Sequence, residues 1–483
     1  MVILDRILHV IPLSTLTSCE DASAHVLILD GIAEIVNYWV TYGMAARVSS
    51  NGIRNTKSIR EISKSTLLSL FGSWLFPIAE QEINERSRCI ALTLICRIVT
   101  IKCQAPMQEG HAAQVCKLLL LALSSPNSDV VSTAIRWGNE ILHADFAGQN
   151  ILIPMYTHTI INALRNASLT ESDLKSIHSF IIAAVPFTLR YPDISLTSWT
   201  GHKANALISN EYLLKDSESN IHYHFGLILT RLLDTKLKSS ELKRNCLWGI
   251  HYLIIVVLAL VDRKGAEVHE KKRSPRALIK NWIITICESS STSGSDSVEF
   301  TALNVLSSLS AYSDALRNVD PTWISHILMH LAVLAQQQIE EASVEIQKIV
   351  ERNAKKRSAK QPSVIEIDTS RLELIASKTS STFDTLRVWM MAVEETLLQD
   401  PEVSSVIFSA IEAALVGALP VDTPWFQKIQ KLNKKESQPL LILGLHMRQS
   451  LEQDRLTQCL QCFETMARAA EGLLLHLVRV LNI

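Results

Sequence analysis

Helical periodicity recurs along the chain and constrains its fold more than any other feature. In residues 70–99, "LFGSWLFPIAEQEINERSRCIALTLICRIV", apolar residues return every three or four positions on both sides of a polar turn, the pattern of two amphipathic helices. Similar segments follow with centres about 20 to 25 residues apart, so helix pairs recur at roughly the 40-to-47-residue spacing of HEAT and armadillo repeats. Each such helix needs neighbours on which to bury its apolar face. The sequence therefore predicts an all-α fold, an irregular HEAT/armadillo-like α-solenoid with polar loop insertions.

Composition supports helix and gives no electrostatic case for a nucleic-acid or anionic-membrane partner. The 483 residues include 15 glycines and 14 prolines, about 3% each and below the roughly 7% and 5% of ordinary proteins, so helix breakers are scarce. The net charge is −1 at pH 7, which gives no long-range attraction for polyanions. With 47% hydrophobic residues, a chain of this length can bury an extensive core, divided into several units or spread along one array.

The first helix pair offers a specific packing prediction. Trp74 lies between Phe71 and Ile78 on the apolar face of the first helix. We expect it to be buried against the second helix, which carries Ile90 and Leu94 on its apolar side.

Polar stretches divide the helical pattern into segments. The predicted segments are 1–190, N-terminal helical repeats; 191–220, a polar connection; 221–350, central helical repeats with a serine-rich loop at 287–297; 351–381, a disordered insertion that begins with a basic run; and 382–483, a C-terminal helical segment. The last segment ends inside a helical pattern, "AAEGLLLHLVRVLNI", so we expect it to be truncated.

One apolar segment imitates a membrane span. Residues 246–261, "CLWGIHYLIIVVLALV", lie between charged stretches, but they contain His251 and are shorter than the roughly 20 residues that a bilayer crossing needs. The interpretation we favour is a helix buried on all sides, without an integral membrane span. A protein anchored in a membrane through this segment is the alternative.

Cysteines and histidines form no recognisable metal or disulfide pattern. The nine cysteines lie mostly in apolar helical stretches, at positions 19, 89, 96, 103, 116, 246, 287, 459 and 462. We interpret them as reduced core residues of a cytosolic protein. Cys459 and Cys462 form a CxxC without the second ligand pair that a zinc tetrahedron requires. His222 and His224 are two residues apart, so on a helix they point to different faces and are not expected to share a metal.

No motif nominates a catalytic centre. The sequence contains no glycine-rich phosphate loop, no HExxH and no GxSxG. Arg86, Arg97 and Arg136 fall on predicted helices as polar stripes, not on a glycine-flanked loop that could reach a nucleotide. We therefore predict no catalytic, cofactor-binding or metal-ligating residue, no cofactor, and no enzymatic activity of the chain itself.

Three short stretches resemble a known family. They are Trp74-Leu75-Phe76 near the end of the first helix, Leu94 to Ile98 ("LICRI") in the second, and Gly148 to Tyr156 ("GQNILIPMY") at the start of a later one. In this order and context they are similar to the helical region of the tuberin and Ral GTPase-activating protein family, and most similar to its beta-subunit branch. The resemblance is closest over residues 65–165 and continues more loosely toward the C-terminus.

The resemblance implies a function that composition and periodicity alone do not. Members of that family are cytoplasmic heterodimers that speed GTP hydrolysis on Ral small GTPases, with the catalytic domain at the C-terminus of the alpha subunit. This chain has no match to that domain. The resemblance therefore implies a non-catalytic, cytoplasmic scaffold or regulatory subunit, with an alpha-type catalytic subunit as its partner and Ral as an indirect one. A generic HEAT/armadillo-type adaptor unrelated to GTPases is the alternative.

Overall fold

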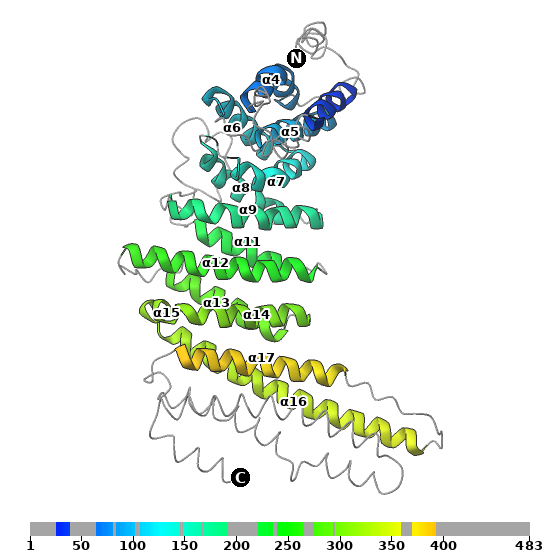
Figure 1. Ribbon diagram of the computed structural model, residues 1–483, viewed down its shortest axis with the longest axis vertical. Helices are drawn as coiled ribbons and strands as arrows, with labels where there is room; N and C mark the ends of the chain where they lie inside the picture. Colours follow the sequence, from blue (N-terminus) through cyan, green and yellow to red (C-terminus); the bar gives the residue numbers. More distant parts are fainter. Residues whose placement is uncertain are drawn as a thin grey trace, which may run out of the picture. The chain divides into compact units, whose positions relative to one another are not determined.

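A computed structural model of the chain describes residues 26–38, 64–80, 84–101, 107–144, 146, 148–165, 169–190, 221–234, 239–264, 275–292, 295–358 and 370–392. Throughout these ranges the regular elements are helices, and no strand occurs among them (Figure 1). The chain divides into two compact units, Met1–Val256 and Val257–Ile483. Each unit is a set of helices packed against one another, which is consistent with the predicted α-solenoid.

The first unit contains a helix over residues 26–38 and eight further labelled helical elements. These are α4 (Lys64–Glu80), α5 (Glu85–Val99), α6 (Glu109–Leu123), α7 (Ser128–Leu142), η1 (Gln149–Ile151), α8 (Leu152–Arg165), α9 (Glu171–Arg190) and α11 (Ile221–Asp234). Helix α12 (Ser240–Lys264) carries the boundary between the two units.

Asparagine caps start two of these helices where the sequence turns polar. The Asn84 side chain accepts a hydrogen bond from the Ser87 amide at 3.2 Å and so begins α5. The Asn127 side chain accepts from the amides of Asp129 and Val130, at 2.8 and 3.1 Å, and begins α7. Each cap satisfies amides that lack a partner within the helix, which sets the point where the chain turns back.

Contacts between alternate helices arrange the first unit in two layers. Helix α4 contacts α6, and α6 contacts α8; on the other side α5 contacts α7, and α7 contacts α9. Sequential contacts such as α4 with α5 and α6 with α7 join the layers, and α11 continues the packing against α8 and α9. Each helix thus buries its apolar face between neighbours before and after it, as the periodicity predicted.

The predicted burial of Trp74 is confirmed. Its side chain is 7% exposed, and α4 packs directly on α5. Leu94 on α5 is buried as expected, whereas Ile90 is partly exposed. Leu94 therefore belongs to the core of the first unit, and Ile90 lies nearer its surface.

An aromatic pair is buried between α8 and α9 in the first unit. The rings of Tyr156 on α8 and Phe180 on α9 stack with their centroids 4.8 Å apart, and both are fully buried. The Tyr156 hydroxyl donates to the Ala134 carbonyl of α7 at 3.0 Å, which satisfies the one polar atom of the pair. Gly138 on α7 leaves the space for both rings, since a Cβ there would lie 2.8 Å from Tyr156 Cε1.

Helix α12 contains the apolar segment 246–261, and the prediction that it is buried on all sides is wrong. Over Ser240–Val261 the helix is long and apolar enough to cross a membrane, with a mean hydropathy of 1.8, and half of that stretch is buried. Cys246 and Leu253 are fully buried, but Trp248 is 42% exposed. The segment is thus buried on one side only, because Trp248, His251 and Tyr252, which are exposed or partly exposed, lie between the buried residues at helical spacing.

The second unit repeats the two-layer arrangement. Its elements are α13 (Pro275–Thr292), α14 (Asp296–Leu309), η3 (Ser310–Tyr312), α15 (Ser313–Val319), α16 (Thr322–Ser358) and α17 (Ser370–Ala392). Helix α13 contacts α14 and α16, and α17 contacts α14 and α16. The Trp389 indole of α17 is buried and donates to the Leu306 carbonyl of α14 at 2.8 Å.

The predicted serine-rich loop at 287–297 is largely wrong. Helix α13 continues to Thr292 and α14 begins at Asp296, so helix covers both ends of the range. The hydroxyls of Ser289 and Ser291 donate to carbonyls of their own helix, at 2.8 and 3.2 Å. Serine composition favours coil, but packing of Cys287 into the core extends the helix past it.

The predicted disordered insertion at 351–381 is also wrong at both ends. Helix α16 covers 351–358, and α17 covers 370–381. Ile375 and Thr379 of α17 are buried, and the Thr379 hydroxyl donates to the Ile375 carbonyl at 2.8 Å. These contacts offset the low local helix preference of a polar stretch. The predicted connection at 191–220 and residues 393–483 of the predicted C-terminal segment lie outside the described residues.

Candidate functional site

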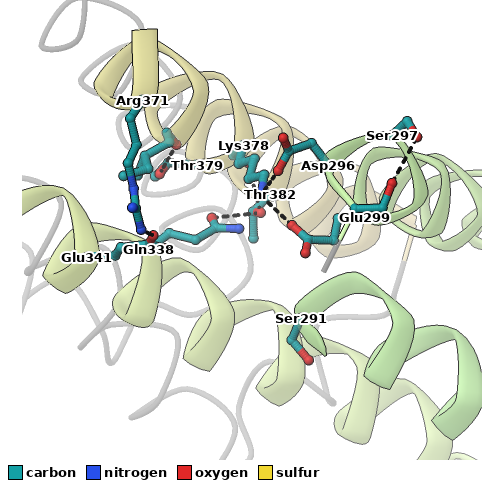
Figure 2. Close-up of polar contacts among 12 residues, drawn as sticks. Ser291, Asp296, Ser297, Glu299, Gln338, Glu341, Arg371, Lys378, Thr379 and Thr382 are labelled. Carbon is teal, nitrogen blue, oxygen red and sulfur yellow. Dashed lines mark hydrogen bonds and ion pairs between the residues drawn. The ribbon is translucent and has the colours of Figure 1, made fainter. Parts of the chain in front are cut away.

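A charged cluster links α14 to α17 in the second unit. Lys378 of α17 lies 2.6 Å from Asp296 Oδ1 and 2.5 Å from Glu299 Oε2, both in the first turn of α14 (Figure 2). Burial by itself would lower the pKa of Lys378, but the hydrogen bonds to the two carboxylates raise it overall. The carboxylates also favour the positive end of the α14 dipole. The cluster therefore fixes the start of α14 against α17.

The same face of α17 makes polar contacts with α16. Arg371 lies 3.1 Å from Glu341 and 3.7 Å from Glu345, and the Thr382 hydroxyl donates to the Gln338 side-chain oxygen at 3.0 Å. Figure 2 shows Arg371 beside Glu341, and Thr382 beside Gln338, on the same helix as Lys378. Together they set how α17 lies on α14 and α16, which is a structural task.

In each unit an aspartate forms an ion pair with an arginine of another helix. In the first, Asp173 Oδ1 accepts from Arg136 at 2.7 Å and from Ser132 at 2.8 Å. Its other oxygen accepts from the Thr170 amide at 3.0 Å, and Thr170 in turn accepts from the Asp173 amide, a reciprocal cap at the start of α9. Burial would raise the pKa of Asp173, but these hydrogen bonds lower it overall. Arg136, predicted as part of a polar stripe, thus joins α7 to α9.

In the second unit Asp320 plays the same part before α16. It accepts from Arg276 of α13 at 2.7 Å and from the Thr322 amide and hydroxyl at 3.0 and 2.8 Å. Its pKa is likewise lowered overall, because these hydrogen bonds outweigh the opposite effect of burial. The same kind of ion pair, between an aspartate at the start of one helix and an arginine of another, therefore joins helices in both units.

Arg88 joins three segments from inside the core of the first unit. Its side chain is 6% exposed; its Nε donates to the Ala79 carbonyl of α4 at 3.0 Å, and its Nη1 to Ser125 after α6 at 3.3 Å. Of the arginines singled out in the sequence, Arg86 is exposed and Arg97 is partly exposed. The buried arginine of α5 is thus Arg88, and its hydrogen bonds join α5 to α4 and to the turn after α6.

A serine and a histidine meet in the second unit. Ser290 Oγ lies 2.9 Å from His330 Nε2, and it also donates to the Cys287 carbonyl at 2.7 Å. A nucleophile must be reachable and activated. Ser290 is 1% exposed, and burial lowers the pKa of His330 to about 4, with the charge of His326 adding to the effect. The pair ties α13 to α16.

Potential metal ligands do not gather in the described part of the chain. Within those residues, no group of three or more His, Cys, Asp and Glu side chains could hold a metal ion. His222 and His224 are both buried on α11, and burial lowers the pKa of His222 to about 4. Five cysteines lie in the described residues and are free thiols: Cys89, Cys96, Cys116, Cys246 and Cys287. Cys459 and Cys462 fall outside those residues.

A shallow apolar groove of about 640 Å³ runs along α6. It is lined by one face of α6 and by the turn that precedes α8: Glu109, Ala112, Ala113, Cys116, Lys117, Leu120, Leu121, Gly148 and Ile151. Gly148 has a φ of 86°, a conformation that favours glycine, and it lets the chain turn close to α6. Ile151 is 43% exposed on the rim. Apolar lining with a few charges on the rim is typical of a binding surface.

Comparison with protein-family models and with curated proteins identifies no relative. No protein-family model matches the chain, and no curated protein matches it. The candidate site is therefore defined by structure alone: the groove on α6. Sequence reasoning missed it, although the glycine at 148 was a visible signal of a turn.

Proposed function

We propose that this chain is a non-catalytic scaffold of a Ral GTPase-activating complex, built as an irregular HEAT/armadillo-like array. Its direct partner would be an alpha-type catalytic subunit, and Ral would be engaged through that partner. We place it in the cytoplasm, without a cofactor, a nucleic-acid partner or an integral membrane span. The observation that carries the proposal is the family resemblance of Trp74 to Phe76, Leu94 to Ile98 and Gly148 to Tyr156.

The positions of these stretches support the proposal. Trp74, Leu94 and Tyr156 are buried in the helix packing of the first unit, and Gly148 forms the turn before α8. A shared set of core and turn residues in the same order is what a shared helical scaffold would require. The polar clusters described above bind helix to helix, which is also the part that side chains play in a scaffold.

Co-purification tests the partner. The full chain and an alpha-type catalytic subunit would be co-expressed and purified through a tag on one of them in moderate salt. We expect the two to elute together in a fixed ratio. A folded chain, verified by circular dichroism, that never co-purifies would contradict the proposal and favour a helical adaptor unrelated to GTPases.

Single-turnover hydrolysis tests the absence of catalysis. A catalytic arginine or equivalent group accelerates GTP hydrolysis by about 10³ to 10⁵. With GTP-loaded Ral and excess chain alone, we expect less than about a tenfold change, which is roughly 1.4 kcal/mol of barrier. A larger acceleration would contradict the proposal, and Ala variants of Arg86, Arg97 and Arg136 would then identify the group responsible.

A further inference from the structure

The groove face of α6 is accessible along the whole helix. Glu109, Ala113 and Lys117 are exposed, and Cys116 and Leu120 are partly exposed. These residues are three or four apart, so they form one continuous stripe of the helix surface. A partner helix could therefore lie along α6 over its full length.

Side-chain size changes along this stripe from small to large. In the N-terminal half, Ala113 is exposed on the stripe and Gly110 is exposed beside it, and nothing lies within 4 Å of the position a Cβ on Gly110 would take. The C-terminal half carries Leu120 and Leu121. A second α6 laid antiparallel would place the leucines of each helix over the small residues of the other. A parallel arrangement would oppose leucine to leucine and leave the small residues uncovered.

The charged residues of the groove also favour the antiparallel arrangement. Glu109 stands at the N-terminal end of the groove and Lys117 near its middle. Lys117 contacts Glu80 of α4 at 3.1 Å, yet its side chain remains 63% exposed and can contact a second carboxylate. Suppose that a two-fold axis crosses α6 at the level of Val115. Lys117 of the second copy then lies at the level of residue 113, four residues from Glu109 of the first copy. Four residues are about 6 Å along the helix axis, a distance that two long side chains can span.

We propose that the α6 groove is a homodimer interface, in which two copies of this chain pack α6 against α6 in antiparallel orientation. A two-fold interface requires a surface that complements itself, and the stripe does so in both size and charge. Ile151 on the rim of each copy extends the apolar contact beyond the helix pair. This inference is independent of the proposed GTPase function.

Sedimentation equilibrium of the full chain, with matched charge reversals, tests the proposal. We expect the wild-type chain to have about twice the mass of the 53.9 kDa monomer. Glu109→Lys or Lys117→Glu alone places like charges together twice across the axis, so each should weaken dimerisation at least about tenfold. An equimolar mixture of the two variants restores both ion pairs and should recover the dimer as a heterodimer.

Lys175→Glu is the control for a nonspecific charge effect. Lys175 on α9 is exposed and contacts Glu241 at 3.2 Å, much as Lys117 contacts Glu80, but it lies away from the groove. This variant should dimerise like the wild type. A wild-type chain that stays monomeric at about 100 µM, above the micromolar range of standard interfaces, would overturn the proposal. So would a dimer that tolerates both single reversals, or a mixture that fails to recover.

Discussion

Gly138→Ala probes a tightly packed contact of the first unit. An added Cβ would lie 2.8 Å from Tyr156 Cε1 and 3.0 Å from Phe180 Cδ2, closer than carbon atoms approach without displacement. Neither ring has free space, because both are fully buried and stacked on each other. The Tyr156 hydroxyl is also held by the Ala134 carbonyl at 3.0 Å. The substitution must therefore push apart α7, α8 and α9.

Two opposing effects set the magnitude. Replacing glycine by alanine inside a helix stabilises it by about 0.8 to 1 kcal/mol. Overpacking a full core costs about 1 to 3 kcal/mol, and the displacement of two rigid rings places this site near the upper value. We expect a net loss of about 1 to 2 kcal/mol in the free energy of unfolding. Gly31→Ala is the control, because Gly31 is exposed in the helix over 26–38 with nothing within 4 Å of its Cβ position; it should gain up to about 1 kcal/mol.

Urea unfolding followed by circular dichroism measures both variants, and native-state hydrogen exchange of α7, α8 and α9 locates the effect. The decisive result is the sign of each change in the free energy of unfolding relative to the wild type: a loss for Gly138→Ala and a gain for Gly31→Ala. If Gly138→Ala is as stable as the wild type or more so, then the three helices do not pack around this glycine as described.

Four further substitutions have expected outcomes that urea unfolding can check. Trp74→Ala should cost about 3 to 5 kcal/mol through the cavity it leaves, and an unchanged midpoint would contradict its burial. Lys378→Met should cost about 1 to 2 kcal/mol by leaving two carboxylates without their cation, whereas Arg387→Met on the same helix, with one exposed ion-pair partner, should cost under about 0.5. Equal costs would show that the Lys378 cluster is no stronger than a surface pair. Burial, with the charge of Arg165 adding to it, lowers the pKa of His158 to about 4, so stability should fall as pH drops from about 6.5 toward 4, where the unfolded chain binds the extra proton. His158→Gln should reduce that slope, and a variant with the wild-type slope would contradict this assignment.

The fold class could be predicted from the sequence because helix packing is driven by apolar periodicity. Phe71, Trp74 and Ile78 mark a buried face by spacing alone, and that face is the one that packs. The limits of the polar segments could not be predicted in the same way. Composition records local preference, whereas the helices at 287–292 and 370–381 form because Cys287 and Ile375 are buried by other helices.

The candidate site depends on contacts between distant parts of the sequence, which periodicity does not describe. Cys116 and Gly148 line the same groove although 32 residues separate them. The sequence of α6, "EGHAAQVCKLLLLAL", is apolar over most of its length, and such a segment predicts burial in the middle of a stack. That its face remains open follows from where α7 and α8 lie, which no single helix encodes.

The turn at Gly148 connects the buried core to the groove, and this connection bears on how the groove could bind. After Gly148 the chain places Ile151 on the rim and then begins α8, whose Tyr156 contacts the Ala134 carbonyl and the Phe180 ring. The part of the rim at Ile151 is thus directly continuous in sequence with a helix that is packed in the core. A surface that is rigid before association loses little conformational entropy when a partner binds, so more of the contact energy remains as affinity. A self-complementary stripe of modest length can therefore suffice for a dimer.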